Sequence, residues 1–396
     1  MMIDMRKELE LYLHIPFCVR KCAYCDFLSA PADEETMRRY VDALICEIES
    51  QSIFAQQYIV TTIFMGGGTP SILAAEETAR IFRALHQIFT FAEKPEITIE
   101  VNPGTVSAEK LRQWKASGIN RLSIGLQSAD DRELEFLGRI HTFEEFADTF
   151  HMARSCGFEN INVDLISAIP GQDIESWERT LKKTAEAKPE HISAYSLILE
   201  EGTPFYTWYI NGERPQEKQD MPALPGEDAD REMYKRTERI LKVYGYERYE
   251  ISNYAKKGYA CRHNLGYWER KEYLGLGLGA ASLIGERRFS NTSSLDEYLQ
   301  IFETGQPSAS ARVGTEILSI EEQMEEFMFL GLRKMKGISY AEFFDRFGRE
   351  VYSVYGEPIR KLKKEGLLKE QGGFLSLTDF GIDISNYVFE KFIFDR

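Results

Sequence analysis

Short apolar runs alternate with longer amphipathic stretches through the first half of the chain. The amphipathic stretches carry polar helix-start residues and predict helices over 33–57, 74–91, 107–117, 143–156 and 173–187. The apolar runs are rich in Val, Ile and Leu, which predicts β-strands. They are LELYLHI (9–15), YIVTTIFMGG (58–67), EITIEVNPG (96–104), INRLSIGLQ (119–127), NINVDLISAIPG (160–171) and HISAYSLILE (191–200). Because the runs are almost continuously apolar, we expect parallel strands that are buried on both faces.

Strands that recur with helices between them predict βαβ units and an α/β fold. Six such units are fewer than the eight of a full TIM barrel. We therefore expect residues 1–228 to form a partial (β/α)6 TIM-like barrel. Functional groups in such a barrel gather at the C-terminal ends of the strands.

The second half of the chain does not continue the alternation of apolar runs and amphipathic stretches. A polar, Pro-rich stretch at 212–228 predicts a boundary, and an extension follows over 229–309. Residues 310–396 suggest three helices and a hairpin, which predicts a smaller, winged-helix-like C-terminal domain. Residues 311–396 hold 13 basic and 15 acidic side chains, a net of −2. Because DNA-binding domains present clustered basic side chains, we do not expect this one to bind DNA.

Composition narrows the function classes. The chain has 396 residues, a formal net charge of −15 and 43% hydrophobic residues. That apolar fraction predicts a folded protein, and the acidic balance disfavours nucleic acid as a partner. No uncharged stretch reaches the roughly 20 apolar residues of a membrane span, and the N-terminus is charged where a signal peptide would be apolar. The sequence therefore predicts a cytosolic protein.

Three of the six cysteines, Cys18, Cys22 and Cys25, form C-x3-C-x2-C directly after the first predicted strand. Iron–sulfur clusters are held by Cys thiolates, usually four for a [4Fe–4S] unit, so three would leave one iron open. Zinc sites use similar gaps, with His14, Cys46 or Cys261 available as a further ligand. Spacing alone leaves both kinds of site open.

The surrounding stretch YLHIPFCVRKCAYCDF resembles the radical S-adenosylmethionine (SAM) superfamily, and within it the coproporphyrinogen-dehydrogenase-like group. The resemblance extends over the whole chain. It implies a barrel of radical SAM type, with a [4Fe–4S] cluster on Cys18, Cys22 and Cys25 and SAM on the open iron.

Later motifs with the same resemblance lie where predicted strands end. Among them are the glycine-rich FMGGGTP (64–70) and the carboxylate in IEVNPG. Glycines let backbone N–H groups approach a polar ligand closely. The resemblance implies SAM contacts at Tyr12, Tyr24, Gly67, Gly68, Thr69, Glu100, Gln127, Arg139 and Asp164. Any one of these side chains alone fits a structural role, but together at successive strand ends they predict a ligand site.

Two features narrow the resemblance within the group. The dehydrogenases carry a further cysteine where this chain has Phe27, and a long N-terminal arm for which the eight residues before the first predicted strand leave no room. The motif H-N-x-x-Y-W, at His263, Asn264, Tyr267 and Trp268, is typical of the HemW family of haem chaperones.

The resemblance to HemW implies haem binding by His263, Tyr267 and Trp268. Residue type alone favours a structural histidine, and Cys261 fits either a second haem ligand or a buried thiol. The implied partner is a haem-accepting protein; membrane haem proteins touched peripherally and a second copy of the chain are further candidates.

Several functions stay open at this point. The first is a haem chaperone with a cluster and SAM, and no catalytic residue is assigned for it. The second is oxidative decarboxylation of coproporphyrinogen III, which the missing arm disfavours. The third is a radical methyltransferase or cyclopropanase, and the fourth a zinc scaffold without catalytic activity. Whether the chain is an enzyme is thus left undecided by its sequence.

Overall fold

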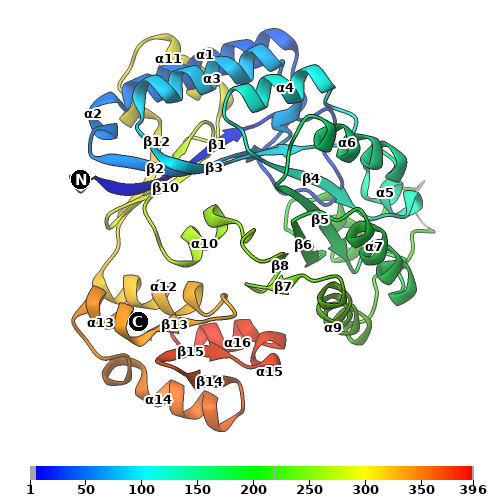
Figure 1. Ribbon diagram of the computed structural model, residues 1–396, viewed down its shortest axis with the longest axis vertical. Coiled ribbons are helices and arrows are strands. Elements are labelled where there is room, and N and C mark those ends of the chain that lie inside the picture. The colour runs from blue at the N-terminus through cyan, green and yellow to red at the C-terminus, as the bar shows by residue number, and fades with distance from the viewer. Residues whose placement is uncertain (1–5, 217–219, 395–396) are drawn as a thin grey trace.

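The computed structural model describes residues 6–216 and 220–394. Its main element is a curved twelve-stranded sheet in the order β12-β11-β10-β9-β1-β2-β3-β4-β5-β6-β8-β7 (Figure 1). The six predicted strands form its parallel centre, each paired with the next. They are β1 (Lys7–Ile15), β2 (Tyr58–Gly67), β3 (Phe91–Val101), β4 (Arg121–Gln127), β5 (Ile161–Ser167) and β6 (His191–Ser196). The predicted α/β partial barrel is therefore confirmed.

Helices cover the outer face of this parallel centre, and the main hydrophobic core lies between the two layers (Figure 1). They are α1 (Glu34–Ser50), α2 (Ser52–Ala55), α3 (Ala75–Ile88), α4 (Ala108–Ala116), α6 (Phe143–Ser155) and α7 (Ile174–Glu186). The starts of α1, α4, α6 and α7 are fixed by Asp33, Ser107, Thr142 and Asp173, whose side chains accept a backbone N–H of the first turn. Such caps satisfy donors that have no partner within the helix.

Two local predictions need correction. The helix expected over 74–91 ends at Ile88, because Phe91 already pairs with Val60 and opens β3. Two short helices, α5 (Asp131–Leu137) and α8 (Pro204–Tyr209), were not expected. They span too few turns to give a clear apolar period. Both follow the C-terminal end of a strand, α5 after β4 and α8 after β6. A 3-10 turn, η1 (Pro70–Ile72), follows β2.

The extension expected over 229–309 adds strands on both sides of the same sheet, but one edge strand, β12, lies at 312–317, within the range expected to belong to the C-terminal domain. On one side, β8 (Asn253–Ala255) pairs antiparallel with β6, and β7 (Glu247–Arg248) pairs with β8. On the other side, β9 (Tyr273–Leu276) pairs in parallel with β1. The sheet continues there through β10 (Ala281–Ile284), β11 (Arg287–Asn291) and β12 (Arg312–Ile317). Of the expected boundary at 212–228, residues 217–219 lie outside the described residues.

Three helices of the extension complete this part of the molecule. They are α9 (Glu227–Val243), α10 (Arg262–Trp268) and α11 (Leu295–Glu303), and η3 (Ser308–Ala311) is a 3-10 turn. The short helix α10 lies under the inner face of the sheet, between it and the C-terminal domain (Figure 1). It carries the H-N-x-x-Y-W motif.

The C-terminal domain has a hydrophobic core of its own. Three helices precede a hairpin, as predicted, and β13 adds a third strand to it in the order β13-β15-β14. Two short helices follow the hairpin. The elements are α12 (Ile320–Gly331), β13 (Ile338–Ser339), α13 (Tyr340–Phe347), α14 (Val351–Lys364), β14 (Leu368–Gln371), β15 (Phe374–Leu377), α15 (Asp379–Asp383) and α16 (Ser385–Glu390). Within the part of the chain that the structure describes, no helix is both long and apolar enough to span a membrane.

Candidate functional site

The inner face of the parallel strands encloses a cavity of about 300 Å³. It begins at the loop after β1 and follows the strands toward α10. Eleven of the residues predicted to bind the cluster or SAM line it: Cys18, Cys22, Cys25, Tyr24, Gly67, Gly68, Thr69, Glu100, Gln127, Arg139 and Asp164. Tyr12 is outside this lining, and its hydroxyl lies 3.0 Å from Nδ1 of His14. The tertiary structure therefore gathers segments separated by more than 100 residues into one site.

The three cysteines lie in the loop between β1 and α1, and contacts with the end of α5 fix this loop. The N–H of Ala23 donates to the carbonyl of Leu137 (3.3 Å), and Nη2 of Arg20 donates to the carbonyl of Gly138 (2.8 Å). Cys18 is buried, whereas Cys22 and Cys25 are partly exposed to the cavity. Burial raises the pKa of the Cys18 and Cys25 thiols, so their thiolates need a bound cation as counter-charge.

The arrangement of the thiols bears on the zinc alternative. Among residues 6–216 and 220–394, no three His, Cys, Asp or Glu side chains converge closely enough to hold one metal ion. A four-iron cluster takes each thiolate on a different iron, so its ligands do not have to meet at a single point. Cys46 is exposed and lines no part of the cavity, and Cys261 is buried elsewhere. Three cysteine thiols beside one cavity match the three protein ligands of a cluster with one open iron.

The glycine turn at the end of β2 lines the cavity, but its backbone N–H groups are paired within the protein: Gly68 donates to the carbonyl of Ile15 (2.8 Å) and Thr69 to that of Phe17 (2.6 Å). The N–H of Gly67 donates to Oε2 of Glu100 at 3.1 Å. Gly67 has a φ of +113°, and a Cβ there would lie 2.5 Å from the ring of His14. Only glycine fits this combination of left-handed backbone and close contact.

Glu100, at the end of β3, is the main titratable group of the site. Burial, and then the nearby charge of Asp164, raises its pKa to about 8, against the opposing hydrogen bond from Gly67. The carboxyl is therefore largely protonated at neutral pH, and a cation bound beside it would favour the ionised form. Such a group fits a cationic ligand such as SAM.

Gln127 and Arg139 show further features of a ligand site. Gln127 ends β4 with a φ of 71°, a backbone conformation that residues other than glycine seldom adopt. Its buried Oε1 has no hydrogen-bond partner among the described residues. Arg139 is held by Asn102 Oδ1 (2.7 Å) and the carbonyl of Gly125 (2.8 Å), both of which accept from its Nη2. Strained backbone and an unpaired polar atom are typical of positions that contact a ligand.

Further polar residues line the cavity, and of these only Asn264, through the H-N-x-x-Y-W motif, was noted from the sequence. They are Arg121, Ser123, Asn162, Ser193, Tyr195, Asn253 and Asn264. Most occupy alternate positions of otherwise apolar strands, which was the signal that could have revealed them. Residues two apart in a strand face the same side, so polar residues at every second position mark a polar barrel interior. Asp164 accepts there from Ser123 (2.9 Å), Asn162 (2.8 Å) and Tyr195 (2.9 Å).

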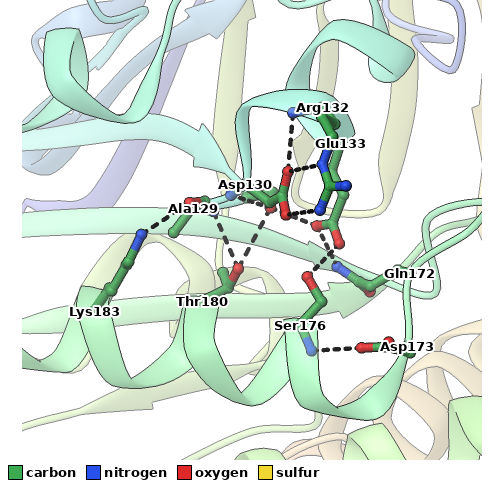
Figure 2. Close-up of polar contacts among 10 residues, drawn as sticks. Ala129, Asp130, Arg132, Glu133, Gln172, Asp173, Ser176, Thr180 and Lys183 are labelled. Atoms are coloured by element: carbon green, nitrogen blue, oxygen red, sulfur yellow. Dashed lines mark hydrogen bonds and ion pairs between the residues drawn. The ribbon is translucent and has the colours of Figure 1, made fainter.

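A buried polar network supports α5 from behind (Figure 2). The Glu133 carboxylate accepts from Gln172 Nε2 (2.8 Å) and Ser176 Oγ (2.6 Å), and also from Ser128 Oγ (2.5 Å). These contacts join the start of α5 to α7 and its preceding loop. Because α5 ends where Gly138 and the cysteine loop meet, the network also holds the cluster loop in place.

The residues of the H-N-x-x-Y-W motif separate into different surroundings. Asn264 lines the cavity. His263 is 1% exposed, and its ring nitrogens lie 2.7 Å from Thr62 Oγ1 and 3.0 Å from the hydroxyl of Tyr267. Burial, and then the charge of Arg121, lowers the pKa of His263 to about 3, so the imidazole is neutral.

Trp268 lies on the other side of α10. It lines a second cleft, of about 340 Å³, that the C-terminal domain shares through Phe327, Lys334 and Arg346. The guanidinium of Arg333 lies 4.3 Å from its ring centroid. The structure therefore does not bring His263 and Trp268 onto one exposed surface.

Cys261 precedes α10 and is fully buried. Its Sγ lies 3.5 Å from Oε1 of Glu96, which also accepts the backbone N–H of His263 (3.1 Å). Burial raises the pKa of the Cys261 thiol to about 12. Of the two roles considered for Cys261, this environment fits the buried thiol.

Comparison with known proteins places the chain. Residues 12–184 match the model of the radical SAM superfamily, and residues 318–384 match the HemN C-terminal domain. The fold resembles that of coproporphyrinogen III oxidase (HemN) from Escherichia coli, with a TM-score of 0.83, 24% identity, and coverage of 98% of this chain and 91% of that one.

Two relatives cover nearly the whole length. Both are named haem chaperone HemW: one from Lactococcus lactis is 36% identical over 391 residues, 99% of each chain, and one from Bacillus subtilis is 35% identical over 384 residues, 96% of this chain and 98% of the relative. With this similarity along its full length, and with the predicted cofactor residues gathered around one cavity, the chain belongs to the HemW family of radical SAM proteins.

Proposed function

We propose that this protein is a haem chaperone, which binds haem and passes it to a haem-accepting protein. The observation that carries the proposal is the similarity to proteins named haem chaperone over 99% of the chain, including the barrel, α10 and the C-terminal domain. A cytosolic location and an acceptor protein as partner, membrane haem proteins included, belong to the same proposal.

The cofactors of the proposal are a [4Fe–4S] cluster on Cys18, Cys22 and Cys25 and SAM in the adjoining cavity. When both are bound, the chemistry that they supply is transfer of an electron from the cluster to the sulfonium group of SAM. The chain's own residues bind and orient SAM, and they are the nine predicted ones: Tyr12, Tyr24, Gly67, Gly68, Thr69, Glu100, Gln127, Arg139 and Asp164. The lining of one cavity by eight of the nine supports this assignment. Tyr12 acts from outside the lining, through its contact with His14.

Haem binding is assigned to α10, with His263 as an iron ligand and Tyr267 and Trp268 as porphyrin contacts; because His263 is buried on the other side of α10 from Trp268, the helix has to shift before one haem reaches both. A neutral imidazole is the form that binds iron, and the low pKa of His263 provides it. Because Nε2 of His263 lies 3.0 Å from the Tyr267 hydroxyl, that contact has to open before the nitrogen can reach iron. The cleft beside Trp268 offers an apolar wall through Phe327, and its charged lining is mixed, with Lys334 and Arg346 beside three carboxylates.

The test is a haem titration of the anaerobically reconstituted full chain, with a parallel assay of coproporphyrinogen III decarboxylation. We expect saturable haem binding with a defined Soret band, transfer of haem to an added apo-haem protein, and no decarboxylation. A chain that carries its cluster but neither binds haem saturably nor releases it would contradict the proposal.

A second candidate is oxidation of coproporphyrinogen III, or a related radical SAM methyl transfer or cyclopropanation. The observation in its favour is the cavity lined by eight of the nine residues proposed for SAM, with the buried Glu100 among them, for which haem carriage alone gives no reason. Decarboxylation in the parallel assay, or SAM-dependent methylation, would establish it.

A further inference from the structure

The short helix α10 joins the barrel to the C-terminal domain, because each of them holds one of its ends (Figure 1). At its start, Oε1 of Glu96 on β3 accepts the backbone N–H of His263 (3.1 Å). Directly after its last turn, Nε of Arg270 donates to Oε2 of Glu326 (2.6 Å), which belongs to α12 of the C-terminal domain. With seven residues, α10 makes about two turns, so a contact at one end bears on the position of the whole helix.

The Arg270–Glu326 ion pair is buried, with Arg270 4% exposed and Glu326 6% exposed. Glu326 has a second partner, because its Oε1 accepts from Nη2 of Arg288 on β11. A buried carboxylate that loses its only cation is strongly destabilised. Because Glu326 keeps Arg288 as a counter-charge when Arg270 leaves, the pair can open without leaving the carboxylate buried and unpaired.

The backbone at Arg270 is strained, with a φ of +54° in the left-handed region that residues other than glycine seldom adopt. The N–H of the next residue, Lys271, donates to the carbonyl of Gly266 (2.9 Å). This contact is typical of a helix that ends in a left-handed residue, and that residue is usually glycine. The ion pair with Glu326 therefore offsets a backbone cost that would otherwise favour unwinding of the last turn of α10.

We propose that Arg270 and Glu326 are positioning residues of α10: through their ion pair, the C-terminal domain holds the helix against the barrel and keeps His263 covered. Opening of the pair frees the end of α10, and the helix can then carry His263 away from Thr62. The consequence for haem rests on the proposed function, which assigns haem to His263, whereas the closed position of the helix does not. When only a fraction of the molecules is open, the apparent affinity for a ligand of the open form is reduced by that fraction. Weakening the ion pair should therefore strengthen haem binding.

Glu326→Gln removes the charge and keeps the shape of the side chain. Two measurements on the full chain without haem follow α10: amide hydrogen exchange of residues 262–270, and modification of the His263 imidazole by diethylpyrocarbonate, located by mass spectrometry. We expect both rates to rise about tenfold, because a hydrogen bond between charged groups is about twice as strong as a neutral one. Modification of His141, a buried histidine of the barrel, should stay unchanged in the same sample.

Glu325→Gln is the matched control. Glu325 is another buried carboxylate of α12, but its Oε1 accepts the N–H of Phe394 (2.9 Å) within the C-terminal domain. This variant should leave the exchange of α10 and the modification of His263 unchanged. Equal acceleration in both variants would mean that general loosening of the C-terminal domain, and not the Arg270–Glu326 pair, uncovers His263, and would overturn the proposal.

If Glu326→Gln does not fold, Arg270→Gly decides, because Glu326 then keeps Arg288 and glycine fits the left-handed backbone without strain. This variant should also speed the modification of His263. Unchanged exchange and modification in a folded form of either variant would overturn the proposal. Haem titration of the same proteins tests the proposed function separately. Faster modification with tighter haem binding supports both proposals, whereas faster modification with unchanged haem binding supports the ion pair as the contact that covers His263 and removes His263 as the haem ligand.

Discussion

The cysteine end of the cavity and helix α10 both carry motifs of the same family, but their side chains are in opposite states. At the cysteine end, Gln127 has an unpaired oxygen and a left-handed backbone, and Glu100 has a raised pKa. On α10, His263 has a partner at each ring nitrogen. The first region is arranged for a ligand in advance, whereas the second must exchange an internal contact for one. A motif match therefore does not reveal whether its residues are free to bind.

The largest effect should come from the cysteine end. Replacing Cys18, Cys22 and Cys25 together by Ala should remove the iron–sulfur absorption, because no other described thiol lines the cavity. Cys46→Ala and Cys156→Ala, at positions outside the site, should keep it. Iron and sulfide analysis of the anaerobically reconstituted proteins is the measurement. A full cluster load in the triple variant would refute the cysteine assignment.

Glu100→Gln tests whether the carboxyl group at the cysteine end of the cavity binds SAM. A charged hydrogen-bond partner contributes about 1.5–3 kcal/mol, so SAM affinity should fall by about 10- to 100-fold. The pKa of Glu100 is raised to about 8, so the ionised form that attracts a cation becomes dominant only as pH rises through 8. SAM affinity of the unmodified chain should therefore rise as pH increases from about 7 to about 9 and level off above that.

The Gln variant is the control for that pH profile, because it has no carboxyl to ionise and should show a flat dependence over the same range. Calorimetry at several pH values measures both proteins. Parallel profiles for the two would assign the pH dependence to another group.

The contact between Nε2 of His263 and the Tyr267 hydroxyl can be removed by deleting one oxygen atom. Tyr267→Phe removes the hydroxyl beside Nε2 of His263 and should strengthen haem binding several-fold, whereas His263→Ala should weaken it about tenfold and shift the Soret band. Both variants should retain the cluster. His141→Ala, another buried histidine with a pKa lowered to about 3, controls for the loss of a core imidazole. Weaker haem binding in Tyr267→Phe would mean that the tyrosine itself holds haem.

His263 should also make the free energy of unfolding depend on pH. Its folded pKa of about 3 lies below the unfolded value near 6.5, so the unfolded chain binds a proton first as pH falls. Its contribution to stability is present above pH 6.5 and is lost progressively toward pH 3. Urea unfolding of the His263→Ala variant should accordingly show a shallower loss of stability over that range.

The smallest effect concerns the Glu133 hydrogen-bond network, which joins α5 to α7 next to the cysteine loop. Glu133→Gln replaces a carboxylate that accepts from Ser128, Gln172 and Ser176. The free energy of unfolding should fall by about 1–3 kcal/mol. SAM affinity should fall only a few-fold, because Arg139 keeps its own contacts with Asn102 and Gly125. Glu135→Gln, on the exposed side of the same helix, should change neither quantity. Denaturant melts and SAM titration separate the two effects.

Much of the site was predictable because a parallel barrel brings the ends of its strands together. Once β1 to β6 were recognised from their apolar runs, residues at successive strand ends had to be neighbours. The polar lining by Arg121, Ser123 and Asn162 was not predicted, although these residues alternate with apolar ones in β4 and β5. That alternation marks one face of each strand as polar, but which face encloses a cavity depends on the curvature of the sheet.

The sequence by itself determined the α/β class, the six parallel strands, the cysteine loop and the helix-rich C-terminal domain. These follow from local periodicity, caps and spacing, which act over a few residues. Only the tertiary structure decided that strands from 247–317 extend the sheet on both sides, that Asn264 of α10 lines the cavity, and that His263 and Trp268 face different surroundings. Those outcomes depend on contacts between segments far apart in the chain, such as Tyr12 beside Gly275 across β1 and β9. No local pattern encodes such contacts, because they arise only when the whole barrel has formed.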